Sequence, residues 1–282
     1  MLTVLEAIKL STEFLDKKGI SEARVNAELL LAEILNCKRL QLYLSFDRPL
    51  SNEETDIYRE HLARRAKYEP LQYITGNVEF MGSKFYVTKD VLIPRPETEI
   101  MVEHIIEEYK NETNLKICDV GTGSGNIAVS LSKNLVEAQI LALDKSEEAV
   151  ALAKQNAFLN DVSSKIQFRV EDIFNFSPDD EFDLIVSNPP YVDEAQYSSL
   201  QEEIIKYEPK MAVSDSDDGY SFYKRISAFA ETHLKKKGKL FFEVGIGQSQ
   251  KVKIILEEKN FSGIKVIKDY SGIDRVISGE KT

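Results

Sequence analysis

The sequence contains few of the residues that build disulfide frameworks and metal centres. Its 282 residues include two cysteines, Cys37 and Cys118, which do not form a Cys-x-x-Cys pair. The three histidines, His61, His104 and His233, are scattered without the spacing of metal ligands. These absences argue against a disulfide-stabilised fold and against a thiolate zinc site, so we predict no metal.

Long apolar runs and a surplus of basic charge are also missing. No apolar run approaches the roughly 20 residues of a transmembrane helix, and the N-terminal stretch is interrupted by Glu6 and Lys9 where a signal peptide would be apolar. The net charge is −11, whereas sequence-independent DNA binding needs a positive footprint. We therefore expect a cytoplasmic protein with no membrane attachment and no direct nucleic-acid partner.

The first 75 residues have the apolar spacing of helices. Apolar residues recur at helical intervals over 2–15. A second helix is predicted in SEARVNAELLLAEIL, with Ser21 as its N-cap. A third begins at SNEE, where Ser51 and Glu54 have the spacing of a capping box. We expect a small helical domain over residues 1–75.

Two short motifs follow this helical region. NVEFMGSKFYVT has the pattern of a β-hairpin around Met81-Gly82-Ser83, within a linking segment predicted over residues 76–90. In LIPRPETE, Pro94 and Pro96 bracket Arg95, and Pro96 is placed near the start of a helix. The hairpin is therefore expected to join the helical domain to the remainder of the chain.

From Leu115 onward, short apolar runs alternate with helical stretches. The predicted strands are KICDV, QILALD, IQFRV, FDLIVS, KLFFEV, IKVIKD and DRVISG. This alternation predicts an α/β fold, with a mainly parallel, Rossmann-like sheet of seven strands in a domain over residues 76–282. The last two runs are separated only by Tyr270-Ser271-Gly272, too short for a crossover helix, so the last strand should be antiparallel.

A glycine-rich loop follows the first strand of this sheet. In DVGTGSGNIAVSL, Gly121, Gly123 and Gly125 allow a sharp turn and close approach of a ligand to the backbone. A dinucleotide-binding fingerprint would have its third glycine at position 126, which is Asn126 here, and no Gly-Lys-Ser/Thr of a phosphate loop follows. A pyrophosphate ligand is therefore less favoured.

Acidic residues follow successive strands. Asp144 lies where an acid accepts hydrogen bonds from ribose hydroxyls in nucleotide-binding sheets. Asp172 can accept from an adenine amino group while Ile173 or Phe174 packs on the ring, and Asp119 can meet an ammonium group. An adenosine at one end and a charged amino acid at the other describe S-adenosyl-L-methionine better than a dinucleotide.

The strand FDLIVS ends in Asn188-Pro189-Pro190-Tyr191. The Asn188 side-chain carbonyl and the Pro189 backbone carbonyl can accept the two N–H groups of a planar nitrogen, and the locked φ angles of the prolines fix the direction of that backbone carbonyl. Two aligned acceptors favour rehybridisation of the nitrogen as it attacks a methyl group. Tyr191 is placed to stack on the flat acceptor.

These motifs resemble the bacterial peptide chain release factor N5-glutamine methyltransferases, a class I S-adenosylmethionine-dependent family. The similarity rests on NPPY, DVGTGSGNIAVSL, LIPRPETE and PLQYITGNVEF, and it extends to EARVNAELLLAEIL and LQLYLSFDRPL near the N-terminus. It implies methylation of the glutamine in the Gly-Gly-Gln motif of class 1 release factors, with residues 1–75 recognising that protein. IPRPETE favours this enzyme over a sibling that methylates a ribosomal protein.

The resemblance also assigns the site. Asn188 to Tyr191 would hold the glutamine, and some family members have tryptophan where this chain has Ile173. The predicted cofactor-contacting residues are Asp119, Gly121, Thr122, Gly123, Ser124, Gly125, Asp144, Asp172, Ile173 and Asn188.

Two alternatives remain open at this point. Adenine-N6 methyltransferases of nucleic acids share a similar tetrapeptide, but the acidic balance and the lack of a basic, aromatic-rich recognition region argue against one. A binding protein that keeps the cofactor fold without catalysis is the other alternative, and the intact Asn-Pro-Pro-Tyr argues against it.

Overall fold

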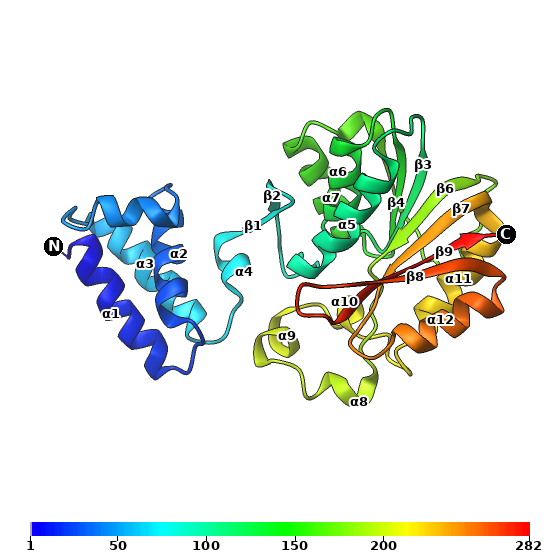
Figure 1. Ribbon diagram of the computed structural model, residues 1–282. Coiled ribbons are helices and arrows are strands. Elements are labelled where there is room, and N and C mark those ends of the chain that lie inside the picture. The colour runs from blue at the N-terminus through cyan, green and yellow to red at the C-terminus, as the bar shows by residue number, and fades with distance from the viewer. Residues whose placement is uncertain (1) are drawn as a thin grey trace. The chain divides into compact units, whose positions relative to one another are not determined.

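The computed structural model describes residues 2–282, which divide into two units (Figure 1). The helical unit comprises the residues up to Gly76 together with Gln201–Tyr207. The sheet unit comprises Asn77–Leu200 and Glu208–Thr282. The helical unit therefore contains a segment that lies far along the chain from the rest of it.

The helical unit is built from amphipathic helices around an apolar core that includes Leu15, Leu30 and Leu31. The capping box predicted at Ser51 and Glu54 is confirmed. Its helices are α1 (Val4–Lys17), α2 (Ala23–Ile34), η1 (Arg39–Leu44), α3 (Asn52–Arg65), α4 (Leu71–Thr75) and α9 (Glu202–Tyr207).

The predicted N-cap at Ser21 is wrong. Glu22 precedes α2 in the left-handed region, with φ 50°, and no side chain caps the helix. With Glu22 in that conformation, the residue that flanks the helix is Glu22, and Ser21 is one position too early to cap it.

The predicted hairpin is confirmed as an antiparallel pair, β1 (Asn77–Phe80) and β2 (Ser83–Tyr86), joined by Met81 and Gly82. Both turn residues have positive φ, as the type I′ turn of two-residue hairpin loops requires. Phe80 and Phe85 are buried in the core of the sheet unit, so the hairpin is fixed to that unit by apolar packing.

The sheet has seven strands in the order β5-β4-β3-β6-β7-β9-β8. β9 runs antiparallel to both of its neighbours, β7 and β8, and the other pairs are parallel, so the predicted fold class is confirmed. The strands are β3 (Lys116–Val120), β4 (Gln139–Asp144), β5 (Ile166–Val170), β6 (Phe182–Ser187), β7 (Leu234–Glu243), β8 (Phe261–Lys268) and β9 (Asp274–Lys281).

Helices cover both faces of the sheet (Figure 1). Alternate residues of β3 point to opposite faces, so Ile117 lies in one core cluster while Cys118 and Val120 lie in the other. The first cluster includes residues of α5 (Pro96–Tyr109), α6 (Asn126–Asn134) and α7 (Glu147–Leu159); the second includes residues of α11 (Ser221–His233) and α12 (Ser249–Glu258). Shorter elements are η2 (Ser163–Lys165), α8 (Glu194–Tyr197) and α10 (Lys210–Val213).

The connectivity creates a switch point between β3 and β6. The chain leaves β3 toward β4 on one side and later returns to β6 on the other. In open α/β sheets, ligands bind beyond the carboxyl ends of the strands at such a point. The glycine-rich loop and Asn-Pro-Pro-Tyr follow these two strands, so the fold brings both motifs to one place.

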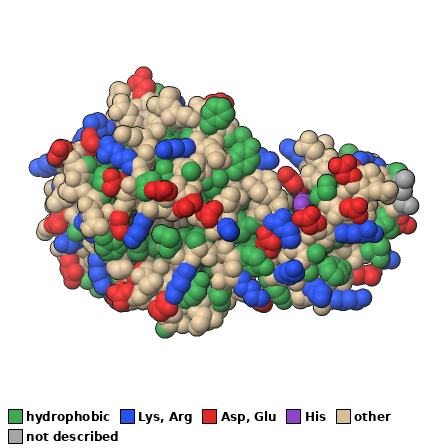
Figure 2. Space-filling view, turned by 180° about the vertical axis from the view of Figure 1, so that it is seen from behind, with side chains coloured by type: hydrophobic (Ala, Val, Ile, Leu, Met, Phe, Trp, Pro, Cys, Tyr) green, Lys and Arg blue, Asp and Glu red, His purple; other side chains and the backbone are tan. Residues whose placement is uncertain are grey.

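The surface carries charges of both signs. Lys and Arg side chains are interspersed with Asp and Glu on the face shown in Figure 2. No helix among the described residues has the length and apolar character needed to cross a membrane.

Candidate active site

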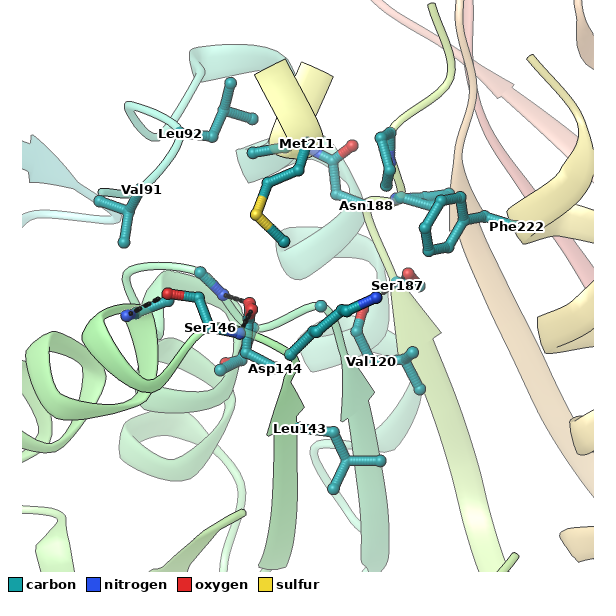
Figure 3. A pocket seen from close by; sticks show the side chains of 18 of the residues that line it. Val91, Leu92, Val120, Leu143, Asp144, Ser146, Ser187, Asn188, Met211 and Phe222 are labelled. Atoms are coloured by element: carbon teal, nitrogen blue, oxygen red, sulfur yellow. Dashed lines mark hydrogen bonds between the residues drawn. The ribbon is translucent and has the colours of Figure 1, made fainter. Parts of the chain in front are cut away.

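A cavity of about 270 Å³ lies at the carboxyl ends of the central strands. Figure 3 shows Asp144 on one side of it and Asn188 with Met211 on another. Its lining comes from the loops after β3, β4, β5 and β6, from LIPRPETE and from the segment before α11. The fold therefore gathers at one cavity the two motifs that suggested a ligand and an acceptor.

The three loop glycines serve two purposes. A Cβ added to Gly121 or Gly123 would meet no described heavy atom within 4 Å, and both residues line the cavity. A Cβ on Gly125 would lie 3.0 Å from the Cβ of Ala153 on α7. Gly121 and Gly123 thus leave space for a ligand against the backbone, whereas Gly125 permits close packing of a helix. Gly125 is absent from the described cavity lining, so its predicted cofactor contact stays a prediction.

Asp144 supports the glycine-rich loop from the end of β4. Its carboxylate accepts the Gly123 N–H at 2.9 Å and the Ser146 N–H at 3.0 Å. Burial raises the pKa of Asp144, and these two hydrogen bonds oppose the rise. A carboxylate offers about four lone-pair sites, so acceptor capacity remains for a ligand at the cavity wall.

Asp172 and Ile173 line the cavity after β5. The Asp172 carboxylate pairs with the Lys145 ammonium at 2.9 Å and accepts the Phe174 N–H at 3.0 Å. Burial works against the charge of Asp172, but these partners together hold its pKa below the usual value. Ile173 is buried and supplies apolar wall beside them.

Asp119 is predicted to contact the cofactor, but it does not belong to the described lining of the cavity. It alternates with Cys118 and Val120 along β3, so its side chain points to the opposite face of the sheet. The Thr122 hydroxyl donates to it at 2.6 Å. Complete burial raises the pKa of Asp119 to about 7. Its contact with an ammonium group stays a prediction that this placement does not favour.

Asn188, Pro189 and Pro190 line the cavity where β6 ends. The Asn188 amide donates from Nδ2 to the Thr98 hydroxyl oxygen at 3.2 Å. An asparagine held from one side of its amide can present the other side to a ligand. The prolines donate no backbone hydrogen bond, which agrees with the end of the strand at Ser187.

Tyr191 is turned away from the described cavity lining. Its ring packs against the core under α11, and a Cβ on Gly245 would lie 3.0 Å from ring atom Cδ2. Its backbone carbonyl accepts from Gln248 at 2.9 Å. Burial raises the pKa of the Tyr191 hydroxyl, which lies 3.5 Å from the Glu243 carboxylate. Stacking of this ring on an acceptor stays a prediction.

The sequence-based site omitted several residues that the structure places at the cavity. The Arg95 guanidinium pairs with the buried carboxylate of Glu208, which also accepts the Ile93 N–H at 3.4 Å. Glu208 comes shortly before Met211 in α10, and Arg95 and Met211 both line the cavity. LIPRPETE was visible as a motif, but its partner more than a hundred residues away carries no local pattern.

Comparisons with known proteins agree with this arrangement. Residues 6–76 match the family model described as PrmC N-terminal domain, and residues 96–215 match that of the Methyltransferase small domain. The chain is 39% identical to the release factor glutamine methyltransferase of Chlorobaculum tepidum, over 98% of this chain and 96% of that protein. It is 40% identical to that of Geobacter sulfurreducens, with the same coverage of each chain.

The chain belongs to the release factor glutamine methyltransferase family.

Solved structures share the fold of this family member at lower identity. A methyltransferase from Pyrococcus furiosus is 18% identical with a TM-score of 0.52, covering 82% of this chain and 99% of that one. The 16S rRNA N2 G1207 methyltransferase of T. thermophilus is 17% identical with a TM-score of 0.53, covering 73% and 50%. These likenesses concern the sheet architecture, whereas the release factor glutamine methyltransferases match along almost the whole chain.

Proposed function

We propose that this protein transfers a methyl group from S-adenosylmethionine to the side-chain amide nitrogen, N5, of the glutamine in the Gly-Gly-Gln motif of class 1 peptide chain release factors. The observation that carries the proposal is that Asn188-Pro189-Pro190 and the glycine-rich loop line the same cavity. Membership of the release factor glutamine methyltransferase family supports it.

The cavity wall suits the cofactor. The open space beside Gly121 and Gly123 lets a ligand lie against the backbone. Asp144 would hold ribose hydroxyls, and Ile173 beside Asp172 would pack on adenine. When bound, S-adenosylmethionine supplies an electrophilic methyl group on a positively charged sulfur.

The chain's own residues orient the glutamine and polarise its amide. The nitrogen of an amide is a poor nucleophile because its lone pair is delocalised. The Asn188 side-chain carbonyl accepts one of its N–H groups and the Pro189 backbone carbonyl accepts the other, which favours a pyramidal nitrogen directed at the methyl group. The nitrogen loses one proton after the new N–C bond forms, so no strong base is required at this site.

The helical domain is the proposed recognition element for the release factor. The described lining of the cavity includes no residue of 2–75, and residues 6–76 match the family model described as PrmC N-terminal domain. Because release factors act in translation, the proposal retains the expectation of a cytoplasmic location.

Incubation with isotopically labelled methyl donor and a class 1 release factor tests the function directly. Label is expected on the glutamine of Gly-Gly-Gln. Label on DNA or RNA, with none on the release factor, would instead favour adenine methylation, and no label anywhere despite calorimetric binding of the cofactor would contradict the proposal.

Asn188→Ala tests the role of the amide. We expect turnover to fall about 100-fold or more, because an oriented polar group that acts in the transition state is lost. Cofactor affinity measured by calorimetry should change far less. Asn134→Ala, which removes an exposed asparagine at the end of α6, is the matched control. A variant that bound cofactor poorly and turned over normally would contradict the assignment.

A further inference from the structure

A chain of hydrogen bonds that the proposed mechanism has not used leads from Asn188 through Thr98, which also lines the cavity. The Asn188 Nδ2 atom lies 3.2 Å from the Thr98 Oγ1 atom, and the Thr98 hydroxyl donates to the Glu243 carboxylate at 2.6 Å. Thr98 is 1% exposed and Glu243 is 3% exposed. A buried carboxylate is therefore connected through one hydroxyl to the amide at the cavity wall.

The fold brings these three residues together from distant parts of the chain. β6 and β7 are parallel neighbours that end at the same edge of the sheet, so Asn188, just after β6, lies near Glu243, the last residue of β7. Thr98 is the third residue of α5, which starts at Pro96 in LIPRPETE and covers this face of the sheet. The arrangement gives LIPRPETE a second function besides starting a helix.

The direction of these hydrogen bonds determines the orientation of the amide. The two sides of an asparagine amide have nearly the same shape and differ in whether they donate or accept. Thr98 has one hydroxyl proton, and it is given to Glu243. Thr98 therefore offers Asn188 lone pairs alone, which an NH₂ group can use and a carbonyl cannot. The Asn188 carbonyl is left on the other side of the amide, for a ligand.

We propose that Thr98 and Glu243 are positioning residues that hold the Asn188 amide with its carbonyl toward the methyl acceptor. This inference rests on the proposed function, because an acceptor with N–H groups needs a carbonyl at this place. With the amide reversed, Asn188 would offer N–H to N–H, and the glutamine nitrogen would lose one of its two acceptors.

Protonation of Glu243 reverses this polarity. A protonated Glu243 donates to Thr98, which can then donate to Asn188 and favour the reversed amide. Burial raises the pKa of Glu243 to about 7, and the hydrogen bond from Thr98 opposes the rise. The charged or titratable groups that face Glu243 from neighbouring elements are Glu97 on α5, Arg275 on β9, Tyr191 after β6 and Tyr223 on α11. Turnover should thus fall as pH decreases from about 8 to about 6.

Substitutions at position 98 test the proposal by kinetics. Thr98→Val keeps the shape and removes the hydroxyl, and we expect kcat to fall about 10- to 100-fold, while KM for the release factor and the cofactor Kd change about twofold or less. Thr98→Ser restores the hydroxyl and should recover most of kcat. Thr232→Val, at an exposed position near the end of α11, is the matched control.

Glu243→Gln tests the carboxylate. It should lower kcat and remove the decrease in turnover between about pH 8 and pH 6.

A second readout does not depend on turnover. In protein labelled with ¹⁵N-asparagine, the Asn188 side-chain NH₂ resonance, assigned by its loss in Asn188→Ser, should exchange slowly with solvent. Exchange should accelerate about tenfold or more in Thr98→Val, because the hydrogen bond to a buried hydroxyl is lost. Slow exchange should return in Thr98→Ser. If wild-type protein fails to methylate the release factor, the proposed function fails, whereas this exchange still reports the orientation of the amide.

Three results would overturn the inference. One is normal kcat and normal exchange in Thr98→Val. Another is a Thr98→Ser variant as impaired as Thr98→Val, which would indicate packing rather than the hydroxyl. A third is an Asn188 NH₂ that exchanges freely in the wild type. If Thr98→Val does not fold, the pH profile and Asn188 exchange of Glu243→Gln decide the same question.

Discussion

Asp119 carries a carboxylate that solvent does not reach, at the end of β3. Complete burial raises its pKa from 3.8 to about 7, although the Thr122 hydroxyl donates to it. In the unfolded chain the same group loses its proton near pH ~4. Between about pH 4 and pH 7 the folded state binds more protons than the unfolded state, so this residue makes the protein less stable as pH rises.

Asp119→Asn should remove that dependence, because asparagine is neutral throughout. Relative to the variant, the wild type should lose about 2–3 kcal/mol of unfolding free energy between pH 5 and pH 8. Urea unfolding of both proteins without added ligand measures the difference. Asp180→Asn, which removes an exposed carboxylate, is the control for loss of one charge. A gap between wild type and Asp119→Asn that stayed constant with pH would show that Asp119 does not titrate as its burial implies.

At the scale of elements, the strands, the hairpin and the start of α5 were predictable because each is encoded locally. Short apolar runs specify buried parallel strands, and Pro96 at the first position of α5 is a recognised helix start. The exception was the start of α2, where a left-handed Glu22 displaced the expected cap. The backbone conformation of a single flanking residue decides where such a helix begins, and the sequence pattern predicts that conformation poorly.

The candidate site was predictable only in part, for a related reason. The glycine-rich loop, Asp144 and Asn188 were visible because each follows a strand. Thr98 and Glu243 were missed because their role exists only when α5 and β7 meet in the folded chain. Asp119 was predicted at the cavity from the loop motif; it is buried outside the described lining, with Thr122 as its hydrogen-bond partner, and its contact with the cofactor stays a prediction.

Asn156 links three elements of the sheet unit. From α7 its side chain accepts the Tyr86 N–H at 2.7 Å, and its NH₂ donates to the carbonyls of Tyr86 at 2.9 Å and Ser124 at 2.8 Å. Tyr86 ends the hairpin strand β2, and Ser124 lies in the glycine-rich loop. The side chain is completely buried; its hydrogen bond to Ser124 is buried and those to Tyr86 are part-buried.

Asn156→Ala should therefore cost more than one ordinary hydrogen bond. We expect a loss of about 2–4 kcal/mol in unfolding free energy, because three hydrogen bonds are lost and the Ser124 carbonyl, in a buried hydrogen bond, becomes unsatisfied. Cofactor binding should weaken as well, because the loop loosens. Urea unfolding and calorimetry measure the two effects. Asn134→Ala removes one part-buried hydrogen bond, from an exposed side chain to the Ser130 carbonyl, and should cost less than about 1 kcal/mol. Equal losses in the two variants would contradict the linking role.

At the scale of the whole molecule, the helical unit is not continuous in sequence. The chain leaves it after Gly76 and enters it again at Gln201–Tyr207, between Asn-Pro-Pro-Tyr and α10. The predicted domain boundary at residue 75 did not include this segment. Deletion of the first 75 residues would therefore remove most of this unit and leave α9 without the rest of it. Point substitutions are the better test of what the unit does.

Substitution of Glu203 on α9 should show that the helical unit depends on the Gln201–Tyr207 segment for its stability. Arg65 on α3 is buried, and its guanidinium donates to Asn26, to the Glu69 carbonyl and to Glu203, the last at 2.8 Å. Glu203→Ala removes the carboxylate that pairs with the buried Arg65 guanidinium. We expect the helical unit to lose about 1–3 kcal/mol of stability.

Hydrogen exchange of backbone amides locates the effect. Exchange should accelerate in α2 and α3 and stay unchanged in β3, β4 and β6, because Glu203 serves the helical unit despite its place in the sequence. Glu202→Ala is the control, because it removes a neighbouring carboxylate that forms an exposed ion pair with Lys206. The stability of both units should stay within about 0.5 kcal/mol of wild type. Uniform acceleration across the sheet strands would mean that the segment stabilises the sheet unit instead, and no acceleration in α2 and α3 would mean that Arg65 is satisfied without it.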